Sequence, residues 1–154
     1  MGRKPTLHDN HVHASRLRDA GLRATGPRLA ILAELESDTR HPSAEMLLEA
    51  LVDHYPSMSL STVYATLEIF LQKGLIRRIS GLAGKLRVDG MLVEHDHAIC
   101  RHCGGVFDIA TDKVQRPTTP TELPDGLQVM KLHIEYEVIC RTCAEIHRPN
   151  ALQA

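Results

Sequence analysis

The stretch SLSTVYATLEIFLQKG, residues 59–74, decides how the first half of the chain folds. A serine at position 59 or 61 can cap the start of a helix, and Gly74 can end it. Its apolar side chains recur at helical spacing and predict one buried face: Val63, Leu67, Phe70 and Leu71. Tyr64 falls on a different face, with Ser61 and Glu68. The helix therefore carries an outward-pointing tyrosine, although an ordinary surface tyrosine would look the same.

Shorter helical segments are predicted before this one. The first is Ala14–Ala20, the second follows a cap at Thr25, and the third follows a cap at Ser43. Residues 1–13 are polar and are expected to be a flexible N-terminus. Three histidines there are expected in solvent rather than on a metal: His8, His11 and His13.

Two short β-type runs, residues 76–79 and 85–89, follow the tyrosine-bearing helix and predict a hairpin. Basic side chains lie along it: Arg77, Arg78, Lys85 and Arg87. Helices followed by a basic hairpin are typical of a winged helix-turn-helix, whose last helix enters the major groove of DNA. We expect DNA contacts from both elements: Ser61, Thr62, Tyr64, Arg77 and Lys85.

The composition is compatible with DNA binding but is not sufficient evidence for it. The net charge is −1, yet residues 1–90 hold 12 basic and 10 acidic side chains, and residues 91–154 hold 6 and 9. A basic front suits a protein that presents one face to phosphates, although so small an asymmetry also arises by chance. The longest apolar run is far too short to cross a bilayer, and no secretory signal is recognisable. A cytoplasmic protein is expected.

Two Cys-x-x-Cys pairs lie in the second half: Cys100-Arg-His-Cys103 and Cys140-Arg-Thr-Cys143. Two intervening residues let each pair offer both sulfurs to one tetrahedral ion. Four sulfurs leave no position for water or substrate, so the pattern predicts a structural Zn(II) site. Disulfides are the alternative, disfavoured in a cytoplasmic chain.

A second candidate metal site begins just ahead of Cys100, at His95-Asp-His97. Side chains alternate along a strand, so the two histidines project to one face and Cys100 to the other. Imidazoles with carboxylates suit Fe(II), Mn(II) or Zn(II). Such histidine pairs also occur as solvated strand residues, and the local sequence leaves both interpretations open.

Several spaced motifs occur together between residues 14 and 147: Arg-Ala-Thr25-Gly-Pro-Arg28, His41-Pro-Ser-Ala, Ser-Thr-Val-Tyr64, Lys-Gly-Leu-Ile, His95-Asp-His97-Ala-Ile-Cys100 and Cys140-Arg-Thr-Cys143. In this order they resemble the ferric-uptake regulators (Fur). The resemblance implies an α+β chain with an N-terminal winged helix-turn-helix and a small α/β dimerisation domain with a four-cysteine zinc site. The expected boundaries are a flexible N-terminus (1–13), DNA-binding domain (14–88), hinge (89–94) and dimerisation and metal-binding domain (95–154).

Within that family the chain is most similar to the peroxide-sensing branch. The resemblance places the regulatory ligands at five positions: His41, Asp89, His95, His97 and Asp108. The iron-sensing branch usually carries glutamate at the positions of Asp89 and Asp108, which favours the peroxide branch here. The implied protein is a homodimer that binds palindromic operators when Fe(II) or Mn(II) is bound. Peroxide would then oxidise His41 or His95.

Other functions remain as alternatives. An iron-sensing or zinc-sensing regulator of the same family is the nearest. A zinc hydrolase would need a placed base, which the sequence does not reveal, and a zinc-ribbon interaction module would not explain the winged helix.

The chain also departs from the family pattern. Pro27 stands where glutamine is usual, and prolines replace the usual amphipathic helix of the second domain: Pro117, Pro120 and Pro124. No third metal site is assigned to Asp96 or His133. Three further histidines are expected on the surface: His54, His102 and His147.

Overall fold

The computed structural model describes residues 7–79, 86–115, 123–130, 132 and 134–146. The chain divides into two compact units, residues 1–92 and 93–154, and the division falls within the segment expected as a hinge. None of the helices among the described residues combines the length and apolar character needed to span a membrane.

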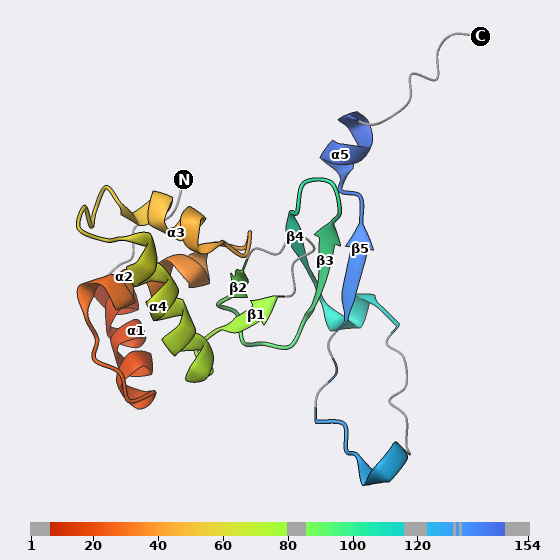
Figure 1. Cartoon of the computed structure of the whole chain (residues 1–154), viewed down its shortest axis with the longest axis horizontal. Coiled ribbons are helices and arrows are strands. Elements are labelled where there is room, and N and C mark those ends of the chain that lie inside the picture. Colours follow the sequence, from red (N-terminus) through yellow and green to blue (C-terminus); the bar gives the residue numbers. More distant parts are fainter. Residues whose placement is uncertain (1–6, 80–85, 116–122, 131, 133, 147–154) are drawn as a thin grey trace. The chain divides into compact units, whose positions relative to one another are not determined.

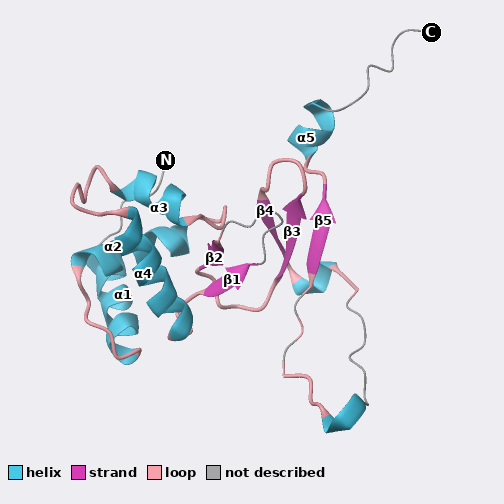
Figure 2. Cartoon of the chain, in the orientation of Figure 1, coloured by secondary structure: helices cyan, strands magenta, loops and turns pink. Residues whose placement is uncertain are grey.

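The first unit is helical and ends in a two-stranded sheet (Figures 1 and 2). Its elements are α1 (Leu7–Asp19), α2 (Gly26–Ser37), α3 (Ala44–Leu51), α4 (Leu60–Gln72), β1 (Arg77–Ile79) and β2 (Arg87–Asp89). The helices share one apolar core, whose largest fully buried side chains include Phe70, Leu17, Ile31 and Leu67. This is the predicted winged helix-turn-helix.

Helix α4 has the predicted ends and the predicted buried face. Ser59 is its N-cap and accepts a hydrogen bond from the Thr62 backbone N–H at 3.3 Å. Gly74 ends the helical run with a φ of 66°, a left-handed conformation that glycine adopts without strain. Val63, Leu67 and Phe70 are fully buried. Packing of this face therefore fixes which side of α4 faces solvent.

The wing is an antiparallel pair in which Arg77 lies opposite Asp89, Arg78 opposite Val88 and Ile79 opposite Arg87. Both strands are shorter than the predicted runs. Residues 80–85, and with them Lys85, lie outside the described residues.

The N-terminus differs from the prediction, because α1 begins at Leu7 rather than at Ala14. His13, expected in solvent, is 6% exposed, and its Nε2 lies 3.0 Å from Glu36 Oε2 on α2. Arg16 of α1 also forms an ion pair with Glu36 and donates to the backbone oxygen of Leu75 at 3.3 Å. These tertiary contacts order a segment whose local sequence is polar.

The second unit is built on a three-stranded sheet of order β4-β3-β5. Its strands are β3 (Asp96–Cys100), β4 (Val106–Ile109) and β5 (Glu135–Val138), followed by α5 (Arg141–Ile146). Strand β3 pairs antiparallel with β4 and parallel with β5. In the described part of residues 110–130 the regular elements are single 3-10 turns, Thr111–Lys113 and Pro124–Gly126. Pro124 begins the second turn; Pro117 and Pro120 lie outside the described residues.

Candidate metal centres and nucleic-acid interface

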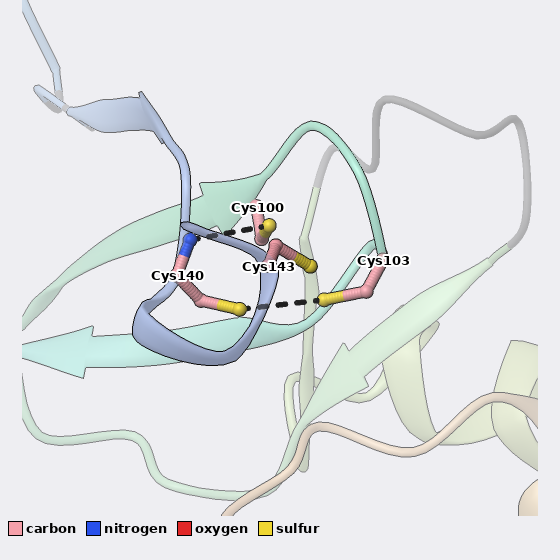
Figure 3. A group of neighbouring side chains, drawn as sticks. All are labelled: Cys100, Cys103, Cys140 and Cys143. Carbon is pink, nitrogen blue, oxygen red and sulfur yellow. Dashed lines mark hydrogen bonds between the residues drawn. The ribbon is translucent and has the colours of Figure 1, made fainter. Parts of the chain in front are cut away.

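The four cysteines converge at one end of the sheet (Figure 3). Parallel strands end at the same edge, and Cys100 of β3 pairs in register with Val138 of β5, two residues before Cys140. Cys103 follows β3 in a turn, and Cys143 lies on α5. The fold thus brings together two pairs that are far apart in the sequence.

The sulfur positions fit a tetrahedral zinc ion. Metal–sulfur bonds of about 2.3 Å hold the sulfurs of a tetrahedron about 3.8 Å apart. The Sγ atoms of Cys103 and Cys140 are 3.8 Å apart, and all four lie within 4.8 Å of one another. None of the four forms a disulfide. The cluster is typical of a structural zinc site, and it leaves no ligand position for a substrate.

Local backbone geometry shapes both pairs. The Cys140 backbone N–H donates to Cys100 Sγ at 3.3 Å, and the Gly105 N–H donates to Cys103 Sγ at 3.4 Å. Gly104 turns the chain after Cys103 with a φ of 68°, where a larger residue would be strained. These N–H groups stabilise negative charge on sulfur, the form that binds metal.

The protonation of the cluster shows why it needs a cation. Hydrogen bonds from the Cys140 and Cys103 backbone lower the pKa of the Cys100 thiol to about 6. The hydrogen bond with the Cys140 side chain, together with burial, raises the pKa of the Cys143 thiol to about 12. Negative charges on sulfurs this close together repel one another. A divalent ion removes that penalty.

His95, His97 and Asp108 form a second cluster within the second unit. His97 lies directly opposite Asp108 in the β3–β4 pair, so their side chains share one face of the sheet. Asp108 Oδ1 lies 3.3 Å from His95 Nε2 and 3.9 Å from His97 Nε2. The two imidazole centroids are 4.6 Å apart. The three groups therefore present their donor atoms to one point.

The orientation of His95 is fixed by the backbone. Its Nδ1 lies 2.8 Å from the carbonyl oxygen of Val93. A carbonyl only accepts, so Nδ1 carries the proton and Nε2 keeps its lone pair, directed towards Asp108. A histidine that donates its other N–H to a carbonyl is the usual arrangement of a metal ligand.

The other two predicted ligands lie in the first unit. His41, immediately before α3, has a φ of 54°, and its Nδ1 lies 3.8 Å from Asp89 Oδ1 at the end of β2. Both residues are buried. Asp89 also accepts hydrogen bonds from the Arg77 guanidinium at 2.9 Å and from the Met91 backbone N–H at 2.7 Å. His41 and Asp89 thus form a buried pair held by the wing.

Arg77, a predicted DNA contact, lies against Asp89 in this structure. Its side chain is 17% exposed, pairs with Asp89 and donates to the Met91 carbonyl. The guanidinium therefore contacts a predicted metal ligand, and its contact with DNA stays a prediction. The basic character of the hairpin predicted the DNA contact, but it could not predict the pairing of Arg77 with Asp89.

An open groove of about 720 Å³ lies beside the first turns of α4. Two basic residues that the sequence analysis did not single out, Arg23 and Arg28, line it together with Ser61 and Thr62. Tyr64 is 39% exposed on the same helix. Arginines and hydroxyls at the start of a helix suit DNA phosphates.

A winged helix joined to a unit that holds a zinc-type thiolate cluster and a histidine–carboxylate cluster defines a metal-dependent DNA-binding regulator. A model of the ferric uptake regulator family matches residues 19–137, and the chain belongs to that family. The resemblance seen in the sequence is thereby confirmed.

Relatives of known function point in the same direction. The chain is 30% identical over 129 residues to the peroxide operon regulator of Bacillus subtilis, covering 84% of this chain and 89% of that one. It is 28% identical over 138 residues to the peroxide-responsive repressor PerR of Staphylococcus aureus (strain Mu50), covering 90% and 93%.

Solved structures share the fold. The ferric uptake regulator of Pseudomonas aeruginosa with manganese superposes with a TM-score of 0.64 at 28% identity, covering 84% of this chain and 98% of that one. The Campylobacter jejuni peroxide stress regulator gives 0.61 at 26% identity, covering 89% and 98%.

Proposed function

We propose that this chain is a peroxide-responsive repressor that binds palindromic operators as a homodimer when Fe(II) or Mn(II) is bound. The observation that carries the proposal is the convergence of His95, His97 and Asp108 on one point. With His41 and Asp89 of the first unit, which the family resemblance adds, the set would offer the nitrogen and oxygen ligands that Fe(II) and Mn(II) accept. The peroxide regulators among its relatives support the choice of signal.

The ligands come from both units, and this gives the metal its regulatory role. His41 and Asp89 belong to the DNA-binding unit, whereas the other three belong to the second unit. One cation held by both would fix the angle between the units, and in a dimer it would set the spacing of the two α4 helices. A metal that binds this form ~100-fold better stabilises it by about 2.7 kcal/mol, enough to switch DNA occupancy.

Peroxide sensing would depend on the histidines. Bound Fe(II) would supply redox activation of peroxide beside its ligands, which Mn(II) would not. In the net reaction the imidazole of His41 or His95 would lose two electrons and replace a C–H hydrogen by oxygen, while one peroxide is reduced to water. The oxidised imidazole would be a poorer ligand. The two units lose their link, and the repressor leaves DNA. The cysteines, held by zinc, take no part.

Dimerisation is assigned to the second unit. Large apolar side chains are exposed on it, which suits burial against a second copy: Phe107, Leu127, Val129, Met130, Ile139 and Ile146. A two-fold dimer presents two copies of α4 and so matches a palindromic operator. A repressor of this kind would act in the cytoplasm.

The test compares the Fe(II) and Mn(II) forms of one preparation. Peroxide should release the Fe(II) form from operator DNA in a mobility-shift assay and leave the Mn(II) form bound. Peptide mass spectrometry should find the mass of one added oxygen atom on His41 or His95 of the Fe(II) form alone. An Fe(II) form that stays on DNA with unmodified histidines would instead assign the chain to iron or zinc sensing.

A further inference from the structure

The exposed tyrosine of α4 is tied to an acidic residue of the neighbouring helix. Helices α3 and α4 pack side by side (Figure 1), and the Tyr64 hydroxyl donates a hydrogen bond to Glu45 Oε1 at 2.9 Å. Glu45 is exposed and lies in the first turn of α3. An acidic side chain is therefore hydrogen-bonded to an exposed residue of the helix that we expect to enter the major groove.

The hydrogen bond has a defined direction. A carboxylate at neutral pH has no proton to give, so the proton belongs to the tyrosine. The same hydrogen bond raises the pKa of Tyr64 above its usual value, which keeps the phenol protonated. With that proton committed to Glu45, the hydroxyl oxygen retains lone pairs that can accept.

The backbone at Glu45 belongs to a helical turn that is held by several contacts. Ser43 caps α3 by accepting from the Met46 N–H at 3.4 Å, and the next residue, Leu47, is fully buried. The Met46 sulfur accepts from Arg87 of the wing at 3.0 Å. The first turn of α3 is thus attached to both the core and β2, which places the backbone of Glu45 beside α4.

We propose that Glu45 is a specificity-determining residue which makes the Tyr64 hydroxyl a hydrogen-bond acceptor towards DNA. In the major groove, the amino groups of adenine and cytosine are donors, whereas guanine O6, guanine N7 and thymine O4 are acceptors. The tied hydroxyl selects an amino group at its base position and rejects a carbonyl there. The inference rests on the proposed DNA binding through α4 and adds which base edge that helix reads.

Because Glu45 is charged, the proposal predicts opposite changes in DNA affinity and in base discrimination when the charge is removed. A carboxylate at the DNA face repels phosphates and lowers affinity for every sequence. In Glu45→Gln, the side-chain amide removes the charge and can donate as well as accept, so the tyrosine becomes able to donate to DNA. Affinity for mixed-sequence DNA should rise while discrimination at one base position falls. A merely structural role for Glu45 would lower both.

The experiment uses the full-length Mn(II)-loaded protein. Its preferred sites are first selected from a randomised duplex pool. Each adenine or cytosine of the selected half-site is then replaced by purine or by 2-pyrimidinone, which lack the amino group. For the wild type, one position should lose about threefold to tenfold in affinity, the value of one hydrogen bond. Tyr64→Phe should show that loss on unmodified DNA and no further loss on the analogue.

Glu45→Gln and a matched control complete the test. Glu45→Gln should bind donor and acceptor bases at that position within about twofold of each other, a ratio that corresponds to less than one hydrogen bond. Glu49→Gln removes the same charge from an exposed residue of the same helix and should keep the wild-type base preference. Thermal unfolding of all three variants should match the wild type.

Two outcomes would overturn the inference. One is an unchanged base preference in Glu45→Gln; the other is an amino-group dependence that persists in Tyr64→Phe. Either leaves the proposed repressor function standing. A wild-type Mn(II) protein that selects no sequence from the pool would overturn both.

Discussion

At the scale of single residues, Asp108 faces two histidines, His97 of β3 and His95 just before that strand. Because it lies 3.3 Å from His95 Nε2 and opposite His97, its loss removes the carboxylate that both imidazoles face. Asp108→Ala should weaken Mn(II) binding at least about tenfold, as loss of a residue close to a metal does. Mn(II) titration measures this, and zinc content should stay at one ion per chain.

The control is Asp112→Ala, an exposed aspartate paired with Lys113 on the turn that follows. It should leave Mn(II) affinity unchanged. An equal loss in both variants would mean that general negative charge, and not the cluster, attracts the ion.

Asp108→Glu tests the response to peroxide separately from the affinity for Mn(II). The longer carboxylate matches the residue usual in the iron-sensing pattern, so Mn(II) binding should persist. Sensitivity to peroxide should fall, measured as the dose that releases half of the Fe(II) protein from DNA. An unchanged dose would show that the length of this carboxylate does not set the peroxide response.

Part of the metal cluster could be predicted from local sequence. Alternation along a strand placed His95 and His97 on one face, because that rule depends only on neighbouring residues. Asp108 reaches them through the register between β3 and β4, which no local pattern encodes. The motif resemblance identified it instead. The pairing of Arg77 with Asp89 was not predicted, because a three-residue strand does not reveal where a guanidinium points.

At the scale of elements, α1 is attached to α2 by a buried histidine. His13→Ala removes the hydrogen bond to Glu36 and should lower the free energy of unfolding by about 1–2 kcal/mol. His11→Ala, exposed on the same helix, should change it by less than about 0.5 kcal/mol. Urea denaturation compares the two. Equal values would mean that the contact between His13 and Glu36 adds nothing.

The end of the wing lies very close to α2. A Cβ on Gly90 would lie 2.8 Å from the Leu35 carbonyl oxygen. Since that oxygen is a backbone atom, the clash could be relieved only by a shift of the main chain. Gly90→Ala should therefore destabilise the first unit by about 1–3 kcal/mol. Because Asp89 precedes this glycine, Mn(II) affinity should fall too.

Gly26→Ala is the matched control for Gly90→Ala. Its Cβ would meet the Tyr55 ring at an ordinary 3.4 Å, at the first position of α2. Stability should be unchanged or slightly higher, because alanine favours a helix. Calorimetry on both variants separates the close approach from the general effect of replacing glycine.

Helices were predictable from the sequence where their caps and apolar spacing agree with the way they pack. For α4, the serine cap, the apolar face and Gly74 all act within the helix, and both ends were correct. For α1, the polar residues 7–13 carry no such signal, and the helix is completed by contacts with residues far along the chain. Tertiary contacts of that kind are not visible in a single segment.

At the scale of the whole molecule, the thiolate cluster holds the second unit together. Cys140→Ser removes a zinc ligand and leaves three thiolates without full charge compensation. Zinc content should fall below one ion per chain, and the unit should lose its structure. Hydrogen–deuterium exchange should then be faster at the β3 and β5 amides than in the wild type. A fully structured, zinc-free Cys140→Ser protein would contradict a structural role.

The position of the two cysteine pairs also determines what happens when a protease cleaves the chain between them. With an ion bound by Cys100, Cys103, Cys140 and Cys143, the backbone from residue 100 to residue 143 forms a closed ring. A protease that cleaves one peptide bond between Cys103 and Cys140 opens the polymer without separating its pieces, since both remain attached to the same ion and paired along β3 and β5. Proteolysis in this region would show two bands on a denaturing gel and one particle in solution.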